Sequence, residues 1–249
     1  VKTTQKDLIF SAERGTAWGT AVHSSPVGLP AKEMAITLEP SVHNFERCQG
    51  IRGDHENDFF IDTNGAIPTA SVAIPMTPQL MELLLPGVLQ TNSDYTKTVS
   101  NYTMQTHNYA ELPTPKNDND GYFYTLERNR PGSDGAEDVI LASAVPTSLK
   151  LSVAPLDNEG VLWGEFEFTG KGYNNDATAS GEDATQASVG DLYKFNAITA
   201  FSFGAYDLTD DLVNFEVNIT SGAKLVNDIP NGEVTFPKWE VTGTFNVLG

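Results

Sequence analysis

The stretch Leu162-Trp-Gly-Glu-Phe-Glu-Phe-Thr169 decides the fold class. Its apolar and acidic residues alternate with a period of two, which is the period of a β-strand and not of a helix. The alternation puts Phe166 and Phe168 on one face of the strand and Glu165 and Glu167 on the other. We expect the phenylalanines to face a core and the glutamates to face water or a channel.

Short runs with the same period recur on both sides of this strand. Turn pairs such as Asn64-Gly65, Asp120-Gly121 and Asn231-Gly232 lie between them. Many short strands separated by polar, glycine-containing turns are typical of a sandwich or a barrel. The predicted strands cover residues 7–12, 33–38, 67–74, 122–127, 148–153, 162–169, 198–203, 213–219 and 241–247.

One segment has helical signals instead. Thr77 is a good N-cap, Pro78 suits the first helical position, and Pro86-Gly87 is expected to end the helix. A helix of two to three turns is marginal alone in water, so it must pack on the sheet. The predicted fold is therefore all-β: a β-sandwich or small barrel of mixed strands, with one short flanking α-helix and long loops.

Three stretches are expected to be long loops: residues 41–58, 91–120 and 170–190. Loops of this length in a compact domain are usually functional or disordered. We find no internal repeat and no clear linker, so the chain is interpreted as one domain over residues 1–249.

The composition excludes several classes of function. Lysine and arginine total 15 against 33 aspartates and glutamates, a net charge of −18. This balance opposes bulk electrostatic binding to nucleic acid or to an anionic membrane, but it suits a wall past which a polyanion slides. Cys48 is the only cysteine, which excludes an internal disulfide framework. Without an apolar signal or spanning segment, the chain is expected to be soluble and to fold in a reducing cytoplasm.

No candidate catalytic or metal site in the sequence has a complete set of residues. Asp118, Asp120, Gly121 and Glu127 match part of a calcium loop, but Lys116 takes the first ligand position. His43 and His55 lie among acidic residues in one predicted loop, which we interpret as a solvated loop. The Glu165 and Glu167 pair would suit glycoside hydrolysis, but strands commonly alternate in this way. We expect no catalytic residue, no metal and no cofactor.

A family resemblance comes from the run Glu13-Arg-Gly-Thr-Ala-Trp-Gly-Thr-Ala-Val22. It resembles a segment near the start of the tail tube proteins of long-tailed, siphophage-type bacteriophages, with the match carried by Thr16, Trp18, Gly19 and Thr20. The predicted hairpin of residues 148–153 and 161–170, and the strands of the C-terminal third, are similar to that family in outline.

The resemblance implies a structural virion protein. Six copies would form a ring, and stacked rings would form a tail tube whose inner sheets surround a lumen for genome delivery. Its partners would be further copies of the chain and other tail proteins: tape measure, terminator, and baseplate or tip. DNA would pass without specific binding, no membrane would be involved, and assembly in the host cytoplasm would place the protein in the phage tail.

Two sets of site residues follow as expectations. The acidic strand faces offer Glu165, Glu167 and Glu216 as lumen-facing candidates. The mixed charges of residues 41–58 suit contact with another copy, and Trp18 is expected to anchor its small-residue segment by burial. The subunit-contact candidates are Trp18, Thr20, Arg47, Arg52, Asp54 and Glu56.

Two alternatives to a tube subunit stay open. One is a carbohydrate-binding or adhesive β-sandwich that stacks sugar rings on aromatic residues; its candidates are Tyr95, Tyr102, Tyr109 and Tyr173. The other is a virion protein of related fold, such as a tail terminator or a decoration protein. Rings or tubes in the purified protein would favour the tube subunit over both.

Overall fold

The computed structural model describes residues 8–15, 18–22, 24–31, 33–49, 54–89, 93–99, 102–108, 122–129, 138–154, 160–174, 185–186, 192–226, 233–235 and 240–248. The fold is all-β with a single α-helix in this part of the chain. The strands are β1 (Ile9–Arg14), β2 (Val27–Gly28), β3 (Met34–Gln49), β4 (Asp54–Pro75), β5 (Ser93–Val99), β6 (Tyr102–Asn108), β7 (Tyr124–Asn129), β8 (Val139–Val153), β9 (Trp163–Thr169), β10 (Gly172–Asn174), β11 (Thr185–Gln186), β12 (Ser202–Phe203), β13 (Tyr206–Asp207), β14 (Leu212–Thr220), β15 (Lys224–Val226), β16 (Glu233–Thr235) and β17 (Glu240–Val247).

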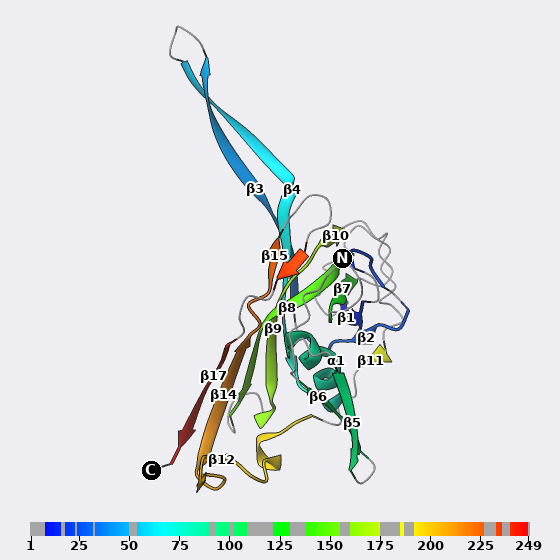
Figure 1. The fold of residues 1–249 in the computed structure, drawn as a ribbon, viewed down its shortest axis with the longest axis vertical. Helices are drawn as coiled ribbons and strands as arrows, with labels where there is room; N and C mark the ends of the chain where they lie inside the picture. Colours follow the sequence, from blue (N-terminus) through cyan, green and yellow to red (C-terminus); the bar gives the residue numbers. More distant parts are fainter. Residues whose placement is uncertain are drawn as a thin grey trace, which may run out of the picture.

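Strand β8 joins two rows of strands (Figure 1). Its first half pairs with β7 and β10, and this row continues through β1 and β2. Its second half pairs with β9 and β14, in a row ordered β3-β4-β9-β8-β14-β17. Ser143, at the change of partner, has a φ of 52°, a left-handed conformation that non-glycine residues rarely adopt. The second row is called the long sheet below.

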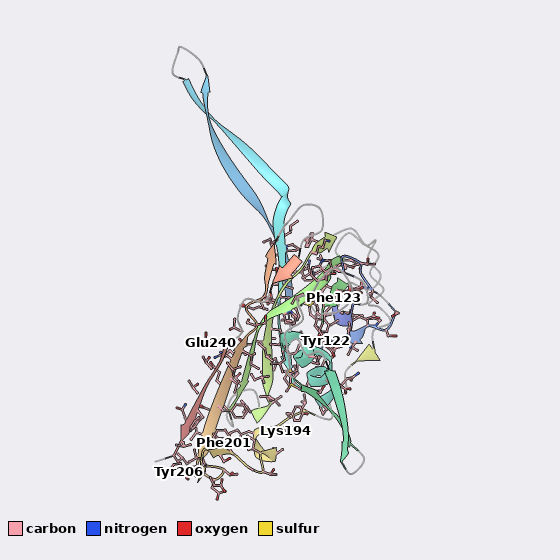
Figure 2. The ribbon with its side chains drawn as sticks, in the orientation of Figure 1. Tyr122, Phe123, Lys194, Phe201, Tyr206 and Glu240 are labelled. Atoms are coloured by element: carbon pink, nitrogen blue, oxygen red, sulfur yellow. The ribbon has the colours of Figure 1, made fainter. Side chains whose placement is uncertain are left out.

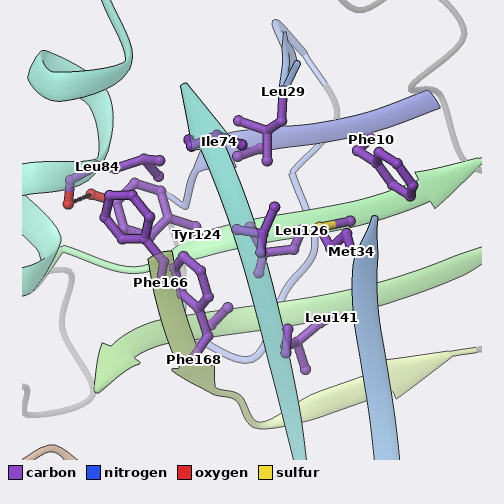
Figure 3. Packing of buried hydrophobic residues seen from close by; sticks show 14 of the residues in the cluster. Phe10, Leu29, Met34, Ile74, Leu84, Tyr124, Leu126, Leu141, Phe166 and Phe168 are labelled. Atoms are coloured by element: carbon purple, nitrogen blue, oxygen red, sulfur yellow. Dashed lines mark hydrogen bonds between the residues drawn. The ribbon is translucent and has the colours of Figure 1, made fainter. Parts of the chain in front are cut away.

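The core lies between these rows and the helix α1 (Pro78–Leu89) (Figure 3). Phe166 and Phe168 of β9 are 1% and 2% exposed, so the strand turns its phenylalanines inward as its alternation predicts. Their rings stack with centroids 6.1 Å apart, and Phe168 makes an edge contact with Tyr124. Leu80, Leu84 and Val88 of α1 belong to the same cluster.

Helix α1 begins where the sequence predicts. The backbone N–H of Leu80 donates to Thr77 Oγ1 at 3.2 Å, which is the expected cap. It does not end at Pro86-Gly87, however, but continues through them to Leu89. The buried Tyr124 hydroxyl donates to the Leu83 carbonyl at 2.7 Å and also bonds to the Gly87 N–H. The hydroxyl therefore bridges the helical turn that Pro86 weakens, and the helix extends past the predicted stop.

Residues 41–58 are not a loop. Strands β3 and β4 pair continuously from Ser41 opposite Asp62 to Gln49 opposite Asp54, which makes a two-stranded ribbon, here called the arm. The register shifts at Pro40, where residues 63–66 lie outside the regular pairing. Figure 1 shows the arm projecting from the body along the longest axis of the molecule. Residues 41–58 show no regular alternation of apolar and polar residues, so the local pattern does not reveal this pairing.

Other predicted boundaries also change. Residues 93–99 and 102–108, expected in a loop, pair as the β5–β6 hairpin, and β10 and β11 lie within the predicted loop of residues 170–190. The predicted strand of residues 198–203 is reduced to β12, and a 3₁₀ turn at Phe195–Ala197 precedes it. The first half of β8 was missed because it is buried on both faces and shows no alternation.

Candidate assembly surfaces

The face of the long sheet that points away from the core holds Glu165, Glu167 and Glu216, the three predicted lumen-facing residues. Glu165 and Glu167 of β9 are exposed opposite the buried phenylalanines. The register pairs Glu165 with Lys150, and Glu216 of β14 lies one strand further along on the same face. The rest of this face is small and polar; its exposed or half-buried members include Ala35, Thr37, Thr69, Ser71, Ser148, Ser152, Asn218, Thr242 and Thr244.

One lysine lies among these carboxylates. Lys150 Nζ is 3.2 Å from Glu216 Oε2, with both side chains more than a third exposed. Hydrogen bonds from Asn218 and then from Lys150 lower the pKa of Glu216, and Glu216 and Glu165 together raise the pKa of Lys150. This part of the face therefore holds three carboxyl groups and one lysine. Lys150 was not singled out from the sequence, because only the strand register brings it to Glu216.

The two edges of the long sheet are open in the described part of the chain. Strand β17 pairs only with β14, and β3 pairs only with β4. Most of β17 is exposed on both faces, including Val241 at 50% and Val247 at 40%. Unpaired edges with exposed apolar residues are prone to pair with another chain. The exposure of β17 is therefore that of an edge strand available for pairing with another chain.

An apolar groove lies where α1, the segment 193–198 and the ends of β8 and β14 meet. It encloses about 210 Å³ and is lined by Met81, Val153, Leu162, Tyr193, Lys194, Phe195, Ala197, Ile198 and Phe215. Backbone hydrogen bonds from Tyr193 to Met76 and from Leu162 to Tyr193 hold the segment beside the helix. Burial raises the pKa of the Tyr193 phenol.

The groove continues into an aromatic cluster beneath β14 and β17. Phe201 stacks on Phe215 at 6.4 Å and meets Phe245 edge-on at 5.3 Å. Tyr206 and Leu248 are 74% and 68% exposed. Figure 2 shows Lys194, Phe201 and Tyr206 at the end opposite the arm. This surface is not evident from the sequence, because residues 198–203 have the alternation of a strand.

The predicted contact residues of residues 41–58 fall on the arm. The register places Arg47 opposite Glu56 and Gln49 opposite Asp54. Arg52 lies outside the described residues.

Trp18 packs against its own chain. Its ring meets Phe123 edge-on, with centroids 5.4 Å apart, beside Val145 and Ala223. Gly19, the next residue, donates its backbone N–H to Ser143 Oγ at 2.7 Å. The backbone N–H of Val22 donates to Thr125 Oγ1 at 2.9 Å. Trp18 therefore fastens the segment after β1 to β7 and β8, while Thr20 is exposed. Their roles as subunit contacts stay predictions.

The described residues offer neither a three-residue metal cluster of histidine, cysteine and acidic side chains nor a membrane-spanning helix. Lys116, Asp118, Asp120 and Gly121 of the partial calcium motif lie outside the described residues, while Glu127 is buried on β7. Among the residues that the structure describes, His, Cys, Asp and Glu nowhere gather in a group of three suited to a metal ion. In the same part of the chain, no helix has both the length and the apolar character needed to cross a membrane.

Comparisons with known proteins give likenesses of structure only. No family model and no curated protein matches the sequence. One similar solved structure is a chain of the PVC sheath-tube complex of an extracellular contractile injection system in its extended state. It has 8% identity and a TM-score of 0.36, over 66% of this chain and 86% of that one.

A second similar structure is a chain of the baseplate of the anti-feeding prophage (AFP). It has 11% identity and a TM-score of 0.36, over 67% of this chain and 90% of that one. What the chain does must therefore follow from its own surfaces.

Proposed function

We propose that this chain is a structural subunit of a phage-type tail tube. Copies join side by side into rings, six to a ring, and the rings stack into a conduit for genome delivery. The role is mechanical, and the subunit catalyses no reaction. Its partners are further copies of itself and the other proteins of the tail.

The observation that carries the proposal is the pair of open edges on the long sheet. Neighbouring strands alternate in direction from β3 to β17, so the two edge strands run in opposite directions. If β17 of one copy lies beside β3 of the next, the pairing is antiparallel and the sheet continues across the junction. Because the two contacting edges differ, such an interface is heterologous and closes into a ring when the rotation permits.

The two faces of the sheet support the same arrangement. Across the junction, Thr242 and Thr244 would continue the polar face beside Ala35 and Thr37, and the apolar face would continue on the other side. A closed ring would then have one small, polar and acidic inner wall. Carboxylates on that wall would release no counterions from passing DNA. The DNA would therefore gain no binding free energy at the wall and would not stall there.

The sugar-binding alternative has less support. Tyr173 packs against the hydrophobic core, and only the backbones of Tyr95 and Tyr102 are described; Tyr109 lies outside the described residues. Among the four candidate tyrosines, none is described as an exposed ring on which a sugar would stack.

Electron microscopy and native mass spectrometry of the purified chain test the proposal. We expect rings or tubes whose fraction rises with protein concentration, and Val241→Lys with Val247→Lys on β17 should abolish them. The matched control is Thr199→Lys with Ala200→Lys, two exposed positions outside β17. A chain that stays monomeric at high concentration contradicts the proposal.

A further inference from the structure

We infer that a calcium ion binds on the buried polar face shared by strands β1 and β7. The site lies within one copy of the chain, so it goes beyond the proposed assembly and does not depend on it. The inference follows from the strand register, the burial of the polar side chains, two buried oxygen atoms and the charge of one carboxylate.

Strands β1 and β7 separate apolar from polar side chains. The residues of these strands that belong to the core cluster include Phe10, Ala12, Tyr124 and Leu126. Alternation places the polar residues on the opposite face: Ser11, Glu13, Thr125, Glu127 and Asn129. The register pairs Ser11 directly with Glu127, and Glu13 and Asn129 lie one cross-strand pair further along on either side. Side chains at such positions are within reach of one another across two strands.

This polar face is shielded from water. Ser11 and Asn129 are each 1% exposed, Glu127 is 2% exposed and Glu13 is 8% exposed. Ser11 Oγ and Glu13 Oε2 are buried oxygen atoms without a hydrogen-bond partner. Buried polar atoms nearly always have a partner. Two such atoms, two residues apart on one strand face, therefore point to a ligand that both atoms contact.

The carboxylate of Glu13 determines the charge of that ligand. Its other oxygen, Oε1, accepts hydrogen bonds from Ser24 Oγ at 2.6 Å and from the backbone N–H of Ser25 at 2.9 Å. Both donors are neutral, whereas a buried carboxylate is costly unless a positive charge lies beside it. Glu127, directly across from Ser11, places a second acidic group on the same face. The ligand that suits this face is therefore a cation.

The donor atoms select the type of cation. Two carboxylates, one amide and one hydroxyl offer oxygen ligands, which suit calcium and magnesium, whereas zinc and copper are bound mainly through nitrogen and sulfur. Calcium accepts about six to eight oxygens in flexible geometry, but magnesium requires a near-ideal octahedron. Calcium therefore fits donors whose positions are set by strand register. Only two of the four residues are acidic, so the set differs from a cluster of three histidine, cysteine or acidic residues, which the described part of the chain lacks.

An ion at this position would fasten three segments of the chain together. Ser11 and Glu13 belong to β1, and Glu127 and Asn129 belong to β7. Glu13 also holds residues 24–25 through its other oxygen. We expect the ion to stabilise the folded chain, because the donors from the two strands come together only when the strands pair.

Thermal unfolding of the unassembled chain, at low protein concentration, tests the site. At a calcium concentration about a hundredfold above the dissociation constant, the thermal midpoint should be about 5–10 °C higher than in EDTA. Glu13→Gln keeps the shape of the side chain but removes its charge. In EDTA this variant should unfold at or above the midpoint of the unmodified chain, because it buries no unbalanced carboxylate at this position. In calcium the order of the two midpoints should reverse.

Three further measurements sharpen the test. Glu165→Gln with Glu167→Gln, the matched control, removes two exposed carboxylates and should keep the full calcium response. Ser11→Ala removes one oxygen donor and should weaken calcium binding at least about tenfold. Native mass spectrometry should find one calcium ion on each unmodified chain and none on Glu13→Gln. Magnesium at the same concentration should raise the midpoint less than calcium does.

Three results would overturn the inference. If the unmodified chain has the same midpoint in EDTA and in calcium, no calcium ion binds. An equal calcium response in the unmodified chain and in Glu13→Gln would mean diffuse binding to the acidic surface, and an equal response to magnesium would overturn the choice of calcium. Each of these results leaves the tube proposal standing, because that proposal depends on the formation of rings and tubes and not on a metal ion.

Discussion

At the scale of single residues, the Tyr124 hydroxyl is the strongest example of one group organising an element. It is fully buried and bridges the Leu83 carbonyl and the Gly87 N–H inside a helix that contains Pro86. A methyl group on Gly87 would collide with the Tyr124 ring, so glycine is needed here for close approach. The tyrosine and the glycine together let the helix pass a residue that normally ends it.

Removing that hydroxyl should destabilise the fold. Tyr124→Phe leaves two buried backbone groups of α1 without their partner, which costs about 1–3 kcal/mol in the free energy of unfolding. Guanidinium denaturation at neutral pH measures the loss. The control is Tyr206→Phe at a position that is 74% exposed, where no change is expected. Equal stability of the Tyr124 variant and the unmodified chain would contradict the bridging role.

The same residue predicts a dependence on alkaline pH. Burial raises the pKa of the Tyr124 phenol above its unfolded value near 10. Below pH 10 both states keep the proton and the contribution to stability is complete. Above pH 10 the unfolded state loses its proton first, so the unfolding free energy falls as pH rises. Denaturation between pH 9 and about pH 11 should show a steeper fall for the unmodified chain than for Tyr124→Phe; parallel curves would refute it.

Trp18 is the second residue with a measurable role. Trp18→Ala removes its edge contact with Phe123 and its packing on Val145 and Ala223. The side chain is only half-buried, so the expected cost is about 2–3 kcal/mol, less than the roughly 3–5 kcal/mol for deletion of a fully buried large aromatic. Thermal and chemical unfolding measure it, with the exposed Thr20→Ala as the control. If both variants unfold like the parent, Trp18 does not anchor this segment.

At the scale of elements, the arm is separate from the body in its strand pairing. The arm adds no strand to the core, because its residues pair only with each other from Ser41 to Asp62. Pro40 and the irregular residues 63–66 mark the point where the ribbon leaves the sheet. An element built in this way is expected to matter for assembly and little for folding.

Deletion of the arm tests that separation. Joining Pro40 directly to Thr63 removes residues 41–62 and keeps Asn64-Gly65, a good turn pair, at the new connection. We expect a folded subunit with a thermal midpoint close to that of the full chain, which forms single rings but does not stack. Circular dichroism and electron microscopy give the two readouts. Tubes of normal length from this variant would show that the arm is not the ring-to-ring element.

At the scale of the whole molecule, acidic charge gathers on one surface. Glu165, Glu167 and Glu216 share an exposed face of the long sheet, with Lys150 between them as a partial counter-charge. In the proposed ring this face becomes the inner wall. Its repulsion of DNA would act only near the wall, because salt screens charges over about 10 Å at 0.1 M.

Charge reversal on this face tests the wall. Glu165→Lys with Glu167→Lys changes exposed side chains, so the cost in stability should stay under about 0.5 kcal/mol per site. Genome delivery by virions with the double variant should slow, and the defect should shrink as salt rises. Asp210→Lys with Asp211→Lys makes the same charge change at exposed positions off the sheet and should have no effect. Normal, salt-independent delivery by the first variant would place the acidic face outside the channel.

The sequence by itself determined the features that depend on near neighbours. The alternation in β9 put its phenylalanines in the core and its glutamates outside, because the side-chain period of a strand is a property of the backbone. Thr77 and Pro78 likewise predicted the start of α1 correctly, since capping groups act within one turn.

Only the tertiary structure decided what depends on distant pairing. Lys150 meets Glu216 through the register of β8 with β14, and α1 extends to Leu89 through a hydroxyl from a residue 41 positions away. The groove joins α1, β8, β14 and residues 193–198, which no local pattern connects. Strand register and groove shape are set by contacts between segments far apart in the chain, and local alternation carries no information about which segments will meet.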